Sequence, residues 1–246
     1  MSDLAIIGGT GLTQLDTLSI SDREIVHTPY GEPSGPLSHG ELYGHKILFL
    51  PRHGYGHTIP PHKINYRANL WALKEAGAKY VFAAAAVGGI RDDMKPSQLV
   101  LPDQIIDYTW SRVTTFFEEG LKHVTHIDFT EPYSPSLRKK IIEAAKKANV
   151  SIIDGATYGA TQGPRLETAA EINRLEKDGC DIVGMTGMPE AALARELELE
   201  YATCAVIANR GAGRGGGKIT MKEIEIEIAR GMEKVAHILE QLVKLV

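Results

Sequence analysis

The chain lacks most of the features that would place it in a specialised class of protein. It has two cysteines in 246 residues, Cys180 and Cys204, so no disulfide framework is expected and a reducing compartment is indicated. It has no block of basic residues and a net charge of −4, which argues against a nucleic-acid partner. The first apolar run, residues 4–7, is too short for a signal peptide or a membrane span. We therefore expect a cytoplasmic protein with neither a membrane nor a nucleic-acid partner.

The chain also lacks internal repeats, low-complexity linkers and breaks in composition, which favours a single domain over residues 1–246. Short apolar runs alternate with segments of helical periodicity along its whole length. Strands are predicted at 4–7, 47–50, 80–87, 99–106, 151–158, 180–185 and 201–208, and helices at 65–76, 136–148, 164–178 and 221–246. An interruption of the last helix near Gly231 is left open.

Two of the predicted strands run directly into residues suited to an anion. The first strand leads into Gly8-Gly9-Thr10-Gly11, a turn that exposes backbone N–H groups. A dinucleotide fingerprint would need a small residue where Gln14 stands, so a simple anion loop fits better. The strand at 47–50 delivers Arg52, a planar fork of donors, and His53 as an adjacent donor.

The nearby His57 and His62 raise the alternative of a metal site. Pro60 and Pro61 exclude one continuous helix carrying both histidines, and no acidic or cysteine ligand accompanies them. A metal centre is therefore not expected.

The stretch 161–190 concentrates polar and glycine residues around a short apolar strand. Gly163-Pro164 breaks the chain before a helix, and Gly179 ends that helix. The following strand ends in Gly184-Met185-Thr186-Gly187, the kind of turn at which open α/β sheets bind ligands. Glu167, at the predicted helix start, is either a solvated acid that stabilises the helix dipole or a group that faces the same crevice.

Several motifs together resemble the purine nucleoside phosphorylase and methylthioadenosine phosphorylase family. They are IIGGTGL at 6–12, RHG at 52–54, NYRANLWALKEAG at 65–77, TQGPRLET at 161–168 and GMTGMPEAALARE at 184–196. The resemblance implies an α/β fold with a mixed central sheet flanked by helices, and a trimer. It also implies phosphorolysis: inorganic phosphate, as co-substrate, attacks ribosyl C1′ and releases a purine base, without a metal or organic cofactor.

The resemblance also assigns residues to the site. The phosphate positions are matched by Thr10, Arg52, His53, Thr186 and the backbone of Ala85 and Ala86. At Ala85 relatives carry a polar side chain, so phosphate affinity is expected to be weaker here. The catalytic positions at the base are matched by Glu167 and Asn209, and further substrate contacts by Leu166, Met185, Arg210, Gly211 and Met221, with His126 supplied by the adjacent subunit.

Chemistry narrows the substrate within the family. Methylthioadenosine phosphorylases place aspartates at the positions of Asn209 and Gly211, and neither residue ionises here. Hypoxanthine carries a hydrogen on N1 that the carboxylate of Glu167 can accept, whereas adenine presents a lone pair that repels it. The sequence therefore points to a 6-oxopurine.

The sugar end points to a methylthio group. Phosphorylases acting on ordinary inosine hold a histidine where Met221 stands, and a thioether suits an apolar 5′ substituent. Met221 as simply the first core residue of the last helix is an equal alternative on pattern alone. We expect a 5′-methylthioinosine phosphorylase, with inosine or guanosine phosphorolysis, methylthioadenosine phosphorolysis, or a non-catalytic nucleoside sensor as rival interpretations.

Overall fold

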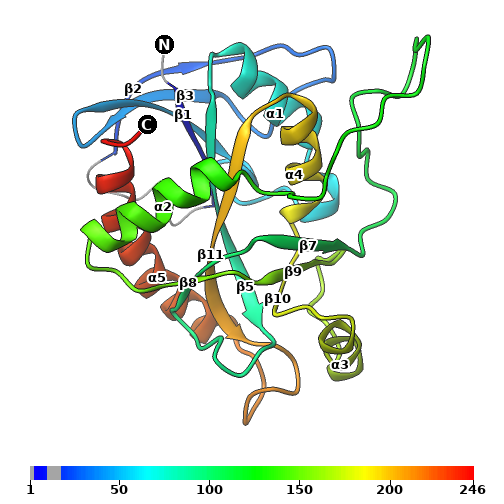
Figure 1. The fold of residues 1–246 in the computed structure, drawn as a ribbon, viewed down its shortest axis with the longest axis vertical. Helices are drawn as coiled ribbons and strands as arrows, with labels where there is room; N and C mark the ends of the chain where they lie inside the picture. The colour runs from blue at the N-terminus through cyan, green and yellow to red at the C-terminus, as the bar shows by residue number, and fades with distance from the viewer. Residues whose placement is uncertain (1–2, 10–17) are drawn as a thin grey trace.

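The computed structural model describes residues 3–9 and 18–246, and its strands form one mixed sheet (Figure 1). The main path is β2 (Leu18–Glu24), β3 (Leu37–Leu42), β4 (His45–Pro51), β1 (Leu4–Gly8), β5 (Tyr80–Gly89), β10 (Ile182–Gly184), β9 (Thr157–Ala160) and β7 (Gln104–Asp107). Beside β5 lies β11 (Glu200–Arg210), followed by β6 (Leu99–Leu101) and β8 (Ile152–Asp154). Parallel and antiparallel pairs both occur, which confirms the predicted mixed sheet.

Helices cover both faces of this sheet (Figure 1). The long helix α5 (Met221–Leu242) packs beside α2 (Pro135–Lys147), and α1 (Tyr66–Glu75) packs beside α4 (Gly187–Glu196). The side chains of β1 divide between two buried clusters, with Ala5 and Ile7 in one and Leu4 and Ile6 in the other. Alternate side chains of a strand point to opposite faces, so each cluster is the core of one layer. A further helix, α3 (Ala169–Lys177), covers a smaller cluster beside β10.

The central strand β5 changes partner halfway along, and this change opens the sheet. Its first four residues pair with β1 through Ala83, whereas Gly88 and Gly89 pair with β10. On the other side β11 follows β5 along its whole length. The residues between the two partners, 84–87, include Ala86, which is exposed although it lies in the middle of a central strand. The opening beside residues 84–87 is where a ligand can reach the backbone of the sheet.

Three predicted elements differ from the structure, one in where it begins and two because they are divided. The helix predicted from Pro164 begins at Ala169, because Thr168 and Glu171 form a capping box that fixes the start there. The strand predicted at 99–106 is two strands, β6 and β7, separated at Pro102, which has no N–H to donate. The strand predicted at 151–158 is likewise divided into β8 and β9, at Gly155, which has a φ of 90°.

The last helix is continuous through Gly231. A Cβ at this position would lie 2.2 Å from Cγ1 of Val206 on β11. Gly231 therefore allows the helix to approach the sheet closely, and it does not interrupt the helix.

No helix of the described residues is both long and apolar enough to span a membrane.

Candidate active site

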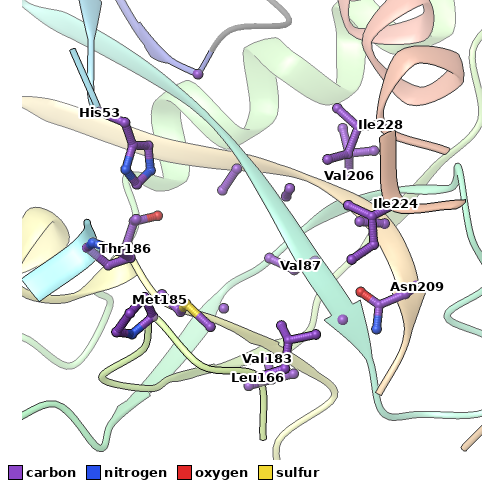
Figure 2. A pocket seen from close by; sticks show the side chains of 18 of the residues that line it. His53, Val87, Leu166, Val183, Met185, Thr186, Val206, Asn209, Ile224 and Ile228 are labelled. Carbon is purple, nitrogen blue, oxygen red and sulfur yellow. The ribbon is translucent and has the colours of Figure 1, made fainter. Parts of the chain in front are cut away.

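A cavity of about 520 Å³ lies at the opening of the sheet. Residues 84–88 of β5 form its floor, and the ends of β4, β10 and β11 bring side chains to its walls. Figure 2 shows His53 and Thr186 on one side of the cavity and Val206, Ile224 and Ile228 on the other. The cavity is lined by Gly9, Arg52, His53, Ala84, Ala85, Ala86, Leu166, Glu167, Met185, Thr186, Val206, Asn209, Gly211, Met221, Ile224, Ile228 and Met232, among others.

Arg52 reaches the cavity as one half of a buried ion pair. Its Nε and Nη2 donate to the two carboxylate oxygens of Glu190 at 2.7 and 2.8 Å, and Nη1 donates to the carbonyl of Ala84 at 2.8 Å. Burial would lower the pKa of Arg52, but the paired carboxylate raises it above its ordinary value. The side of the guanidinium that carries Nε and Nη2 thus binds Glu190, where the sequence predicted an anionic ligand. One N–H on each terminal nitrogen remains for another acceptor.

Glu190 is fully buried and was not found from the sequence. Its Oε1 also accepts the hydroxyl of Tyr201 at 2.8 Å, and that hydroxyl lies 3.0 Å from Thr203 Oγ1. The carboxylate is therefore well satisfied, as a buried charge requires. Nothing in the motif signals this role, because Glu190 and Arg52 are 138 positions apart.

His53 is an acceptor at the cavity in its neutral form, where the sequence predicted a donor. Its Nδ1 lies 2.8 Å from the carbonyl of Ile59, which can only accept, so Nδ1 carries the hydrogen. Burial, with the nearby Arg52 cation and His57, lowers the pKa of His53 from 6.5 to about 4. The ring is therefore neutral at pH 7, and Nε2 offers a lone pair.

The other predicted phosphate positions lie around the same end, as far as they are described. Thr186 precedes α4, and its side chain caps no backbone group of that helix. Ala85 and Ala86 lie on the open part of β5. Thr10 lies outside the described residues.

The predicted base residues Leu166, Glu167 and Asn209 line the same cavity. Glu167 and Leu166 lie in the loop before α3, and the hydroxyl of Thr161 donates to Oε1 of Glu167 at 2.7 Å. Glu167 lines the cavity and precedes Thr168, the cap of α3, so it does not lie in the first turn of that helix. Asn209 Nδ2 donates to the carbonyl of Arg210 at 2.7 Å, which fixes the orientation of its amide.

Two predicted contacts lie away from this cavity. The side chain of Arg210 binds Asp92, with Nη1 3.0 Å from the carbonyl and Nη2 3.1 Å from Oδ1. His126 is exposed on the long connection between β7 and α2. Its predicted role belongs to a neighbouring subunit and stays a prediction.

The remaining wall of the cavity is apolar. Ile224, Ile228 and Met232 recur at helical spacing on the face of α5 toward the cavity, with Val206 opposite on β11 (Figure 2). Met221 also lines the cavity, but it is 65% exposed and lies at the rim. The sequence identified Met221, whereas the deeper apolar wall comes from the next turns of the same helix.

The described residues contain no group of three or more His, Cys, Asp and Glu side chains placed to hold a metal ion.

Known proteins match this chain over nearly its whole length. A model of the phosphorylase superfamily matches residues 3–244. The chain is 57% identical over 222 residues to a probable S-methyl-5′-thioinosine phosphorylase of Xanthomonas campestris pv. campestris, covering 90% of this chain and 89% of the relative. It is 46% identical over 251 residues to the 6-oxopurine nucleoside phosphorylase of Pyrococcus furiosus, covering 100% of this chain and 91% of the relative.

Among solved structures, the methylthioadenosine phosphorylase of Schistosoma mansoni in complex with adenine superposes with a TM-score of 0.94. It is 31% identical, and the match covers 100% of this chain and 92% of that one. Since the family model spans nearly the whole chain and relatives of this kind match it from end to end, the protein belongs to the phosphorylase superfamily.

Proposed function

We propose that the protein catalyses phosphorolysis of 5′-methylthioinosine to hypoxanthine and 5-methylthioribose 1-phosphate. The observation that carries the proposal is one cavity that joins an anion end, a base end with Glu167 and Asn209, and an apolar wall on α5. The relatives named above are nucleoside phosphorylases, and one bears the name of this activity.

At the base end, Glu167 favours a 6-oxopurine. Thr161 occupies one carboxylate oxygen, Oε1, which leaves Oε2 to accept the N1 hydrogen of hypoxanthine. Asn209 keeps a second N–H beyond the one that it donates to Arg210. As the bond between C1′ and the base breaks, its electron pair moves onto the purine, and the Asn209 amide stabilises the charge that develops there.

At the sugar end, the wall made by Val206, Ile224 and Ile228 favours a methylthio group over a hydroxyl. Burying an unpaired hydroxyl against such a wall costs roughly 1–3 kcal/mol. The preference of methylthioinosine over inosine should thus reach about one to two orders of magnitude in kcat/KM.

At the anion end, the phosphate co-substrate meets a guanidinium whose charge is balanced by Glu190 and an imidazole that is neutral. Nε2 of His53 can accept the hydrogen of a monoprotonated phosphate, while the free N–H groups of Arg52 donate to its bare oxygens. The attacking oxygen forms the new bond to C1′ as the purine leaves. No organic cofactor is needed for this exchange.

The test is base release from methylthioinosine, methylthioadenosine, inosine and guanosine, each with and without phosphate. We expect methylthioinosine to be fastest and every turnover to require phosphate and to survive chelators. Faster turnover of inosine would assign the protein to ordinary purine nucleoside phosphorolysis, and equal turnover of methylthioadenosine would refute the argument from Glu167. Binding of the nucleosides without turnover would support the sensor interpretation.

We further propose that the enzyme is a cytoplasmic homotrimer in which His126 reaches the site of a neighbouring subunit. The exposed position of His126 on the connection between β7 and α2 supports this arrangement.

A further inference from the structure

We propose that Arg112 is a positioning residue of the nucleoside site, which holds the segments that carry Glu167 and Met185 in place relative to each other. The proposal rests on the function proposed above. It concerns a residue outside the lining of the cavity that acts mainly through backbone carbonyls.

The guanidinium of Arg112 joins two segments that lie far apart from it in the sequence. Nη1 donates to the carbonyls of Met185 at 2.8 Å and Met188 at 2.6 Å. Nη2 donates to the carbonyl of Gln162 at 2.8 Å and approaches that of Thr161 at 3.3 Å. These carbonyls come from the turn between β10 and α4, with the first residues of α4, and from the loop after β9, the two segments that border the base and ribose part of the cavity.

The contacts require an arginine and not merely a positive charge. None of the ion pairs among residues 3–9 and 18–246 includes Arg112, and its hydrogen-bond partners are carbonyls, the side-chain oxygen of Gln162 and the hydroxyl of Tyr66. Its guanidinium also lies 5.7 Å from the centre of the Tyr66 ring. A planar fork with five donors serves carbonyls on two sides at once, whereas a lysine ammonium carries three donors on a single atom.

The two segments that Arg112 joins carry groups of the candidate site. Thr161, whose carbonyl lies 3.3 Å from Nη2 of Arg112, donates its hydroxyl to Glu167 at 2.7 Å. The other segment contains Met185 and Thr186, which line the cavity. A small shift between the segments would therefore move the acceptor of the purine N1 hydrogen away from the ribose wall. Misplacement by about 1 Å is enough to cost on the order of a hundredfold in rate.

The connection that carries Arg112 has other anchors, which do not touch the cavity. Glu196, at the end of α4, accepts from the hydroxyl of Thr115 at 2.6 Å and from the N–H of Phe116 at 2.7 Å. Arg67 pairs with Glu118 at 2.7 Å. The connection thus stays attached when Arg112 is replaced, and Arg67→Gln is a matched control that removes an arginine anchor of the same connection.

The experiment compares wild type, Arg112→Gln, Arg112→Lys and Arg67→Gln. For each we would measure the ratio of kcat/KM for methylthioinosine to that for methylthioadenosine at saturating phosphate, together with Tm. Both Arg112 variants should lower this ratio at least about tenfold, because Glu167 is no longer held at the base. Arg67→Gln should leave the ratio within about twofold of wild type.

A merely structural role would lower Tm or the active fraction and slow both nucleosides equally, so an unchanged ratio in Arg112→Gln overturns the proposal. If Arg112→Gln does not fold, Arg112→Lys decides in the same way, and weakened hypoxanthine binding by calorimetry is expected for it. A wild-type enzyme without phosphorolysis of either nucleoside would instead refute the proposed function, which keeps the two failures distinguishable.

Discussion

Arg52 contributes both to the stability of the protein and to its candidate active site. It closes a buried ion pair with Glu190, and it lines the cavity with its remaining N–H groups. The same side chain therefore contributes to the stability of the core and to the anion end of the site. A single substitution of Arg52 removes both contributions at once, so a second variant is needed to measure them separately.

We predict that Arg52→Ala lowers the free energy of unfolding by about 3–5 kcal/mol, because it leaves Glu190 buried without its partner. It should also cost at least about 1.5–3 kcal/mol of transition-state stabilisation in kcat/KM for phosphate. The double variant Arg52→Met with Glu190→Met should regain most of the stability and none of the activity. Urea unfolding and steady-state kinetics check both parts, and recovery of phosphorolysis in the double variant would remove Arg52 from the phosphate site.

His53 makes stability depend on pH at the anion end. Because its pKa is lowered from 6.5 to about 4 on folding, the unfolded chain binds a proton between these values that the folded chain does not. The free energy of unfolding therefore falls as the pH drops from 6.5 toward 4. For a half-buried ring this loss is at most about 2–3 kcal/mol, and above pH 6.5 there is no loss.

The measurement is the unfolding free energy of wild type and His53→Asn between pH 7.5 and pH 4.5, in phosphate-free buffer. Asparagine keeps a donor for the carbonyl of Ile59 but does not titrate. The advantage of wild type over the variant should shrink as the pH falls. Two curves that stay parallel over this range would mean that His53 is not held neutral.

At the scale of elements, helix α5 links the core to the substrate pocket. Its N-terminal half presents Ile224 and Ile228 to the cavity, and its C-terminal half fills the core with Val235, Ile238 and Leu239. Gly231 lies between the two halves, where the helix meets Val206 of β11. Packing at this point therefore sets the width of the apolar wall.

We predict that Gly231→Ala costs about 1–3 kcal/mol of stability, since the new methyl would lie 2.2 Å from Val206 Cγ1. Because Val206 also lines the cavity, the KM for methylthioinosine should rise more than the KM for phosphate. Gly217→Ala, where an added Cβ meets nothing within 4 Å, is the matched control. Equal effects of the two substitutions on stability and KM would contradict this account of the helix contact.

The rim position of Met221 gives a second prediction for α5. Since Met221 is 65% exposed, a hydroxyl at the sugar end can reach water beside it, whereas Ile224 lies one turn further along the wall. Ile224→His should thus narrow the preference for methylthioinosine over inosine more than Met221→His does, by up to about one to two orders of magnitude in kcat/KM. A larger effect of Met221→His would place the 5′ group at the rim.

At the scale of the whole molecule, the sequence predicted what is local and missed what is made by long-range contact. Strand ends and turns are signalled by glycine and proline, so the segments around Arg52 and Glu167 could be predicted from local pattern, whereas the mixed sheet was expected from the resemblance of the motifs to a known family. The Arg52–Glu190 pair and the carbonyl contacts of Arg112 join residues more than 45 positions apart, and no spacing rule encodes them. The capping box of Thr168 and Glu171 is also a local signal, and it outweighs Pro164 in setting the start of α3.

The connection between β7 and α2 carries several exposed apolar side chains. Trp110 is 66% exposed and Val124 75%, and Val113 and Leu121 are also exposed. Figure 1 shows this connection extending away from the body of the molecule. Exposed apolar side chains gathered on one segment are typical of a surface that another protein covers.

We predict that this segment lies against a second copy of the chain and that His126 completes that copy's site. Diluting the enzyme below the dissociation constant of its oligomer should then lower its specific activity, in parallel with the loss of oligomer in sedimentation. Trp110→Lys should shift both curves to higher protein concentration, because it places a charge in an apolar contact. His126→Ala should leave assembly unchanged and raise the KM for the nucleoside, since its exposed side chain takes no part in the core. A monomer with full activity at every concentration would remove both the trimer and the role of His126, and would leave the cavity of one chain sufficient for the reaction.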